Sequence, residues 1–134
     1  MKITTALAGA ALAALALAGT AAAAPAPSTD GKLWLTVTRT TADGASTTGN
    51  LWLECPDGEG GAGHPHRASA CADLAAAHGD LDALPGRPSA LCSNDAVHVV
   101  ATAHGRYGSR AVHWEHAYES DCHLTLATGE IFDF

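Results

Sequence analysis

Apolar and polar residues alternate in several segments of the chain, and such alternation predicts half-buried β-strands. In residues 32–39, Leu and Val at every second position would face one side, while Trp and Thr would face the other. Comparable patterns predict further strands at 51–55, 96–103, 111–118 and 130–134.

One stretch has the periodicity of an α-helix instead. Residues suited to a buried face recur with helical spacing between Cys71 and His78. Ser69 is a suitable N-cap, and Gly79 is suited to ending the helix. Residues 119–128 predict a second, short helical turn.

The order of these elements predicts the fold class. Residues 104–109 contain two glycines and predict a hairpin turn between the third and fourth strands. Two strands, a helix, two strands, a helical turn and a strand, joined by hairpin-length links, favour an antiparallel sheet with helix on one side. We therefore expect an α+β domain.

The N-terminal segment has the pattern of a secretory signal peptide. Lys2 gives a positive start, and an apolar run of Ala, Leu and Gly leads to a small-residue tract suited to signal peptidase. The run is short and no basic stop-transfer cluster follows it, which argues against a transmembrane anchor. We expect a signal peptide at 1–23, a flexible arm at 24–31 and one domain at 32–134 of a secreted protein.

The acidic composition narrows the range of partners. The formal net charge is −7 at pH 7, and removal of Lys2 with the signal peptide would make the mature chain more acidic. An acidic balance argues against nucleic acids and anionic membranes as partners.

Four cysteines lie in the exported part, at Cys55, Cys71, Cys92 and Cys122. A zinc site would normally contain a close cysteine pair, and none is present. An even number of cysteines in an oxidising compartment predicts two disulfides, for which three pairings are open.

The histidines could indicate a metal site. His64 and His66 flank a proline, and His113 and His116 are three residues apart. An offset of three places side chains on opposite faces of a strand, which weakens the second pair as a chelate. We expect surface or packing histidines, with no metal and no cofactor.

The sequence gives less support to two other functions, an enzymatic one and ligand binding by tryptophans. No serine lies in a nucleophile motif, so the sequence does not predict an enzyme. Trp34, Trp52 and Trp114 could form a ligand platform, although tryptophans in small sheet proteins are more typical of a core or an interface.

Several separated blocks resemble one known family. They are GHP at 63–65, SACADLAA at 69–76, GDL at 79–81 and AL at 83–84, with matching spacings to the cysteines and to a terminal Phe. On these blocks, residues 33–134 resemble the secreted Streptomyces subtilisin inhibitor-like family. His64 matches a family position and is expected to brace the loop by local hydrogen bonding.

The resemblance implies an architecture. It implies a five-stranded antiparallel sheet with two short helices packed on one face. It also implies disulfides Cys55–Cys71 and Cys92–Cys122, and a homodimer formed through the other face of the sheet, which would use the tryptophans.

The resemblance also implies a function, the inhibition of extracellular subtilisin-type serine proteases by a substrate-like loop. The loop comprises Leu91, Cys92, Ser93, Asn94, Asp95 and Ala96, and the contacted bond would be Asn94–Asp95. Leu91 lies three residues before Asn94, where subtilisin-like enzymes have an apolar pocket.

The loop departs from the usual family pattern of Pro, then Met or Lys, then an apolar residue. Ser93 leaves the backbone less restricted than Pro would, and Asp95 places a charge on the leaving side. A secreted binding or structural protein on the same scaffold, without inhibitory activity, is therefore the alternative hypothesis.

Overall fold

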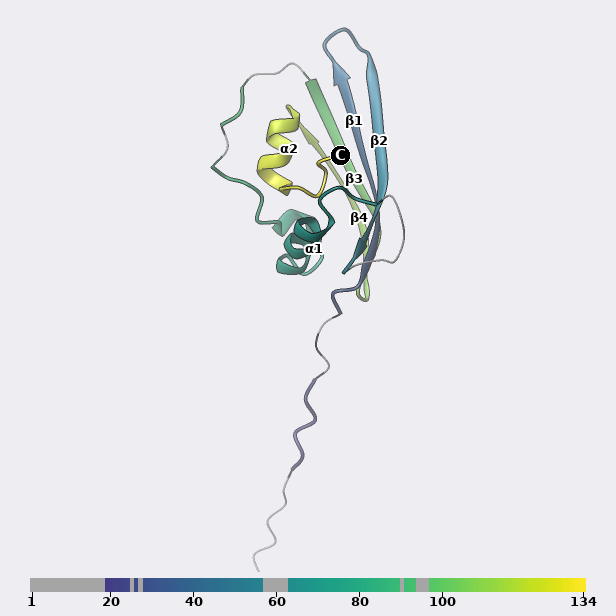
Figure 1. Ribbon diagram of the computed structural model, residues 1–134, viewed down its shortest axis with the longest axis vertical. Helices are drawn as coiled ribbons and strands as arrows, with labels where there is room; N and C mark the ends of the chain where they lie inside the picture. The colour runs from purple at the N-terminus through teal and green to yellow at the C-terminus, as the bar shows by residue number, and fades with distance from the viewer. Residues whose placement is uncertain (1–18, 25, 27, 57–62, 90, 94–96) are drawn as a thin grey trace, which may run out of the picture.

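The computed structural model describes residues 19–24, 26, 28–56, 63–89, 91–93 and 97–134 (Figure 1). Its elements, in chain order, are β1 (Gly31–Thr41), β2 (Ser46–Cys55), α1 (Arg67–Ala76), the 3-10 turn η1 (Leu81–Ala83), β3 (Val97–Tyr107), β4 (Arg110–Tyr118) and α2 (Asp121–Thr128).

The strands form one antiparallel sheet in the order β2-β1-β3-β4. Two hairpins, β1–β2 and β3–β4, join along β1 and β3, and α1 lies in the long connection between them. Both helices lie on the same side of the sheet, and the other face is left open (Figure 1). The α+β class and the one-sided helix layer are as expected.

The core lies between the sheet and the helices. Leu33, Leu35 and Val37 of β1 are fully buried there, as the alternation in 32–39 predicts. Leu74 of α1 and Leu124 of α2 are buried residues of the same cluster. The period of two along β1 therefore separates the core face from the outer face.

The predicted fifth strand is wrong. The sheet that the described residues form has four strands, and residues 130–134 follow α2 as a turn and an irregular end. Neighbouring Ile131 and Phe132 are both buried, at 0% and 2% exposure, so they do not alternate as a strand would. The Phe132 ring stacks on Trp114 with centroids 5.4 Å apart. The apolar end therefore packs into the core instead of pairing at a sheet edge.

Two predicted boundaries also move. The helix begins at Arg67 with His66 as N-cap. Ser69 lies inside it, where its single hydroxyl proton is shared between the His66 carbonyl, at 3.1 Å, and the Glu130 carboxylate. The predicted turn at 104–109 is mostly strand, because β3 pairs with β1 as far as Tyr107. Only the residues at 108–109 turn.

His64 holds the C-terminal segment against the rest of the fold through a hydrogen bond to Ile131. Its Nε2–H donates to the Ile131 carbonyl at 2.7 Å, and its Nδ1 accepts from the His66 amide at 3.0 Å. Both ring nitrogens are thus used by the neutral tautomer. Burial lowers the pKa of His64, and the bond to Ile131 opposes that shift. The expected local hydrogen bonding is present, but the bonds of His64 reach His66 and the chain end at Ile131, not the described residues of the loop.

We predict that His64 makes the stability of the fold depend on pH. The folded state holds the pKa of His64 below the ordinary value of about 6.5, so the unfolded chain binds more protons beneath that pH. The stabilisation is complete above pH 6.5 and decreases as the pH falls toward the folded pKa. Urea unfolding measured at pH 7.5 and at pH 5 tests this prediction. The decrease in the unfolding midpoint between the two pH values should be smaller in His64→Gln than in the parent chain.

His98 provides a matched control, because it is exposed on β3. The substitution His98→Gln should keep the parental pH dependence. An unchanged pH dependence in His64→Gln would contradict the assignment.

Candidate functional site

The predicted loop lies between η1 and β3, and the structure describes its first half. Leu91 is 98% exposed, and Ser93 is exposed as well. Residues 94–96, which include both sides of the predicted contacted bond, lie outside the described residues. The site is therefore characterised by the segments that enter and leave it.

The entering side is fixed by a disulfide. Cys92 is bonded to Cys122, the second residue of α2, with Cα atoms 5.6 Å apart. The start of α2 is itself capped, since the buried Ser120 hydroxyl accepts from the His123 amide at 3.3 Å. Leu124 then buries its side chain in the core. Cys92 is consequently attached to a helix end that is fixed on the sheet.

The leaving side runs directly into the sheet. Val97 is the first residue of β3 and is paired with Thr41 at the end of β1. Because β3 lies between β1 and β4, its backbone is hydrogen-bonded on both sides along much of its length. The two ends of the loop are thus held by different elements of one core.

An ion pair links these two anchors. Arg39 Nε in β1 donates to Asp121 Oδ1 at 2.7 Å, and Asp121 directly precedes Cys122. Both side chains are partly exposed, so the pair contributes only about 0–1 kcal/mol to stability. Its contribution is positional, since it joins the start of α2 to the strand that pairs with Val97. The sequence contains no pattern that would have identified a pair so far apart.

The segment before the loop is also tied to α2. The Arg87 amide donates to the Leu126 carbonyl at 2.9 Å. Gly86 makes this approach with φ of +59°, and a Cβ there would lie 2.1 Å from the Leu126 oxygen. Only glycine fits, because it lacks a Cβ and tolerates positive φ.

A second contact in this segment reaches the C-terminal end and α1. The Arg87 guanidinium and the Ser69 hydroxyl both hydrogen-bond the Glu130 carboxylate. Both bonds lower the pKa of Glu130, and the bond from Ser69 has the larger effect. The charged carboxylate thereby connects three separate segments beside the loop.

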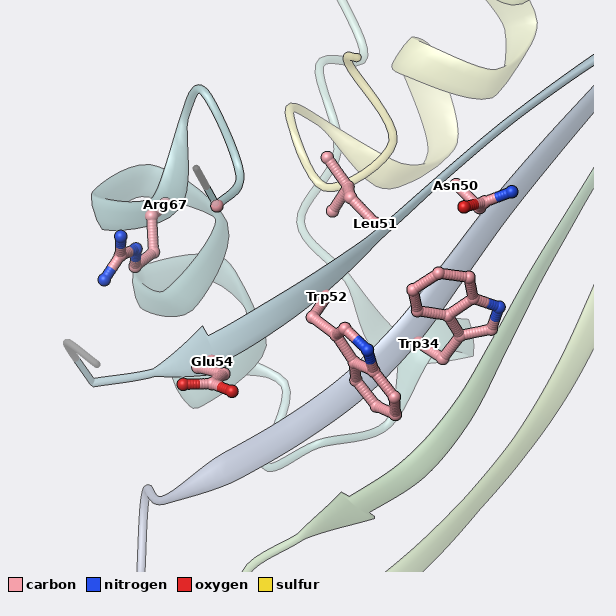
Figure 2. A pocket seen from close by; sticks show the side chains of 7 residues that line it. Trp34, Asn50, Leu51, Trp52, Glu54 and Arg67 are labelled. Atoms are coloured by element: carbon pink, nitrogen blue, oxygen red, sulfur yellow. The ribbon is translucent and has the colours of Figure 1, made fainter. Parts of the chain in front are cut away.

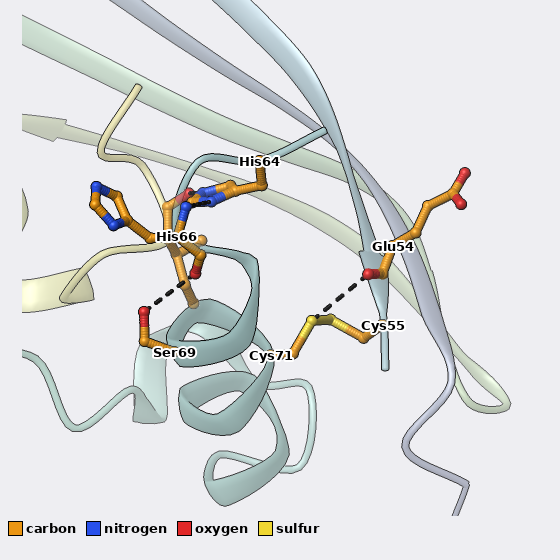
Figure 3. The surroundings of a disulfide bond; sticks show 7 residues. Glu54, Cys55, His64, His66, Ser69 and Cys71 are labelled. Carbon is orange, nitrogen blue, oxygen red and sulfur yellow. Dashed lines mark hydrogen bonds between the residues drawn. A yellow bond between two sulfur atoms is a disulfide. The ribbon is translucent and has the colours of Figure 1, made fainter. Parts of the chain in front are cut away.

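The other disulfide secures the platform. Cys55 at the end of β2 is bonded to Cys71 in α1, with Cα atoms 5.6 Å apart (Figure 3). Both pairings are those implied by the resemblance, and the described residues contain no free cysteine. The cysteine spacing alone leaves three pairings open.

The three tryptophans do not form one platform. Trp34 and Trp52 lie on the outer face, with ring centroids 5.0 Å apart (Figure 2), and Trp52 is 46% exposed. Trp114 lies on the helix side, where its indole N–H donates to Asp82 at 2.8 Å. Trp114 therefore packs against the core, and only Trp34 and Trp52 lie on the face that the implied dimer would use.

A cavity of about 350 Å³ adjoins the outer tryptophans. It lies along β2 and is lined by Trp34, Asn50, Leu51, Trp52, Glu54, Gly63 and Arg67 (Figure 2). Lys32 sits above the Trp52 ring, 5.0 Å from its centroid, and forms an ion pair with Glu54 at 2.6 Å. The hydrogen bond and the charge of Lys32 lower the pKa of Glu54.

His113 and His116 lie on opposite faces of β4, as the strand geometry predicts. His116 lies on the helix side, with its ring 4.7 Å from that of Tyr118, whereas His113 faces outward toward His104. Within the described residues, no group of three or more His, Cys, Asp or Glu side chains is placed to hold a metal ion. In that part of the chain, no helix has the length and apolar character needed to span a membrane.

Comparison with known proteins identifies relatives over most of the chain. A family model described as subtilisin inhibitor-like matches residues 27–120. A protein of Streptomyces avermitilis named as a serine protease inhibitor is 41% identical over 133 residues, covering 98% of this chain and 88% of the relative. The subtilisin inhibitor of Streptomyces albogriseolus is 35% identical over 124 residues, covering 88% and 85% respectively.

A solved structure shares the fold. It is Streptomyces caespitosus sermetstatin, crystallised in complex with Bacillus licheniformis subtilisin. The match has a TM-score of 0.56 and 26% sequence identity, and it covers 78% of this chain and 99% of sermetstatin.

Proposed function

Because this chain belongs to the subtilisin inhibitor-like family, whose members are protease inhibitors and not enzymes, we propose that it inhibits a subtilisin-type serine protease. The inhibitory element is the loop at 91–96, and Asn94–Asp95 is the bond offered to the protease. One observation carries the proposal: the Cys92–Cys122 disulfide joins a residue before that bond to a residue after it.

The physical basis of inhibition is an ordered loop. A serine protease binds an extended segment and attacks one carbonyl carbon. A free peptide loses conformational entropy on binding, whereas a loop held at both ends has already lost much of it. Cys92, fixed on α2, and Val97, paired in the sheet, are the two fixed ends.

The same anchors oppose product release. Cleavage of Asn94–Asp95 would leave two pieces that Cys92–Cys122 still joins covalently. The new carboxylate and amine would stay near each other, so religation would compete with dissociation. The Arg39–Asp121 ion pair supports this by holding the α2 end beside β1.

The side chains around the bond set the target. Leu91 offers an almost fully exposed apolar side chain, and burying it in a pocket would contribute about 1.5–3 kcal/mol. Asn94, adjoining the attacked bond, is uncharged and does not suit a trypsin-like pocket. Asp95 favours a protease with a basic group on the leaving side, because an unpaired carboxylate is costly to desolvate.

We also propose that the protein is secreted. The signal-peptide pattern at 1–23 and the two disulfides both support export, since disulfides persist in oxidising compartments. The mature protein would then comprise a short arm at 24–31 and the inhibitory domain at 32–134.

A homodimer through the outer face of the sheet is the remaining part of the proposal. Trp34 and Trp52 support it, since aromatic residues are enriched at interfaces and Trp52 is exposed on the open face of the sheet. The loop is anchored to α2 and to β3, so a dimer contact on the outer face of the sheet would not involve Cys92 or Cys122.

Titration against subtilisin-like, trypsin-like and chymotrypsin-like proteases tests the inhibitory function. We expect stoichiometric inhibition of a subtilisin-type enzyme by the mature chain. The measured mass of the mature chain also tests whether the signal peptide is cleaved after Ala23. The substitution Asn94→Pro should abolish inhibition, because Pro restricts the backbone that the protease must bind.

Asn94→Lys is the matched control, because it keeps an ordinary backbone at the same position. This variant should gain inhibition of a trypsin-like protease, whose pocket accepts a basic side chain. Rapid cleavage of the parent chain without inhibition would contradict the proposal and favour the non-inhibitory alternative.

The proposed dimer predicts a response to charge on the outer face. Trp52→Glu should convert the dimer to a monomer in sedimentation measurements, because a carboxylate would be buried without a partner. Thr47→Glu, at an exposed position of β2, should leave it dimeric. A parent chain that sediments as a monomer at micromolar concentration would refute the dimer and leave the inhibitory proposal standing.

A further inference from the structure

Two histidines face each other across the second hairpin, on the outer face of the sheet. His104 of β3 and His113 of β4 are directly opposite in the ladder. Their Nδ1 atoms are 3.3 Å apart, and both residues are exposed. The inhibitory loop uses neither residue, and the periodicity of the sequence does not pair them.

We propose that His104 and His113 form a binding site for a divalent transition-metal cation, with Zn²⁺ as the ion whose geometry fits. Zinc binds imidazole nitrogen at about 2.0–2.1 Å with tetrahedral angles, which places two nitrogen ligands about 3.3–3.4 Å apart. The two Nδ1 atoms already have that separation. The pair is therefore spaced to bind without rearrangement of the strands.

The protonation of the pair is compatible with metal binding. Without metal, one Nδ1–H donates to the other Nδ1, so one lone pair is occupied. Moving that proton to Nε2 of the same ring frees both Nδ1 lone pairs for the cation. This exchange is a change of tautomer within one ring, so it releases no proton to solvent.

The surroundings leave room for a cation. Arg106 lies two residues further along β3, but its guanidinium donates to the Ser109 carbonyl at 3.1 Å, toward the hairpin turn. Glu115 lies two residues along β4 from His113, so the two share the outer face. The acidic net charge of the chain also attracts cations.

Two protein ligands leave coordination positions to be filled. Water can fill them on a single chain, or the same pair from a second copy can do so if two outer faces meet. The stoichiometry separates these cases, at one ion per chain or one ion per two chains, and both support His104 and His113 as ligands. The inference does not depend on the inhibitory function.

Isothermal titration of the purified chain with ZnCl₂ tests the site. We expect saturable binding, and we expect His104→Ala and His113→Ala each to weaken it by about tenfold or more because each removes one of two ligands. His98→Ala is the matched control, since His98 is an exposed residue of β3 that lies opposite Thr40 in the ladder. It should bind like the parent.

A second readout uses Trp34, which is paired with His104 in the ladder. Cu²⁺ also binds imidazole and, being paramagnetic, should quench the fluorescence of a tryptophan so close to it. Trp34→Phe should lose much of this quenching and keep the binding. Parental Zn²⁺ affinity in both histidine variants, or an equal loss in His98→Ala, would overturn the proposal.

Discussion

The Cys92–Cys122 disulfide is the constraint on which the functional part of the fold depends. It attaches the start of the loop to α2, and α2 is fixed on the sheet by its buried face. The loop leads directly into Val97, the first residue of β3. The partner strand β1 carries Arg39, which pairs with Asp121. A disulfide, strand pairing and an ion pair therefore connect the segments on the two sides of the proposed contact bond.

Local patterns predicted most of the sheet and both helical regions. The alternation in 32–39 depends on a period of two, and the structure buries the predicted face of β1 completely. The C-terminal end could not be predicted in this way. Ile131 and Phe132 suit a strand by composition, but two long-range contacts determine their place: the stacking of Phe132 on Trp114 and the His64 bond to Ile131.

The candidate site was predictable to the extent that it is local. The cysteine and the exposed Leu91 are visible in the sequence, and the resemblance supplied the disulfide pairing. The supports of the loop are long-range contacts between ordinary residues. Arg39 meets Asp121 across 82 positions, and His104 meets His113 only because the register of the second hairpin aligns them. The hydrophobic periodicity of a sequence does not predict long-range pairs of this kind.

The central claim is that the frame keeps the two sides of the cut bond together. It is tested most directly by isolating the chain cleaved at Asn94–Asp95, with its disulfides intact, and incubating it with a subtilisin-type protease. Mass spectrometry should show the intact chain reappearing, with loss of one water, until both forms coexist. A cleaved chain that is never religated would contradict the account.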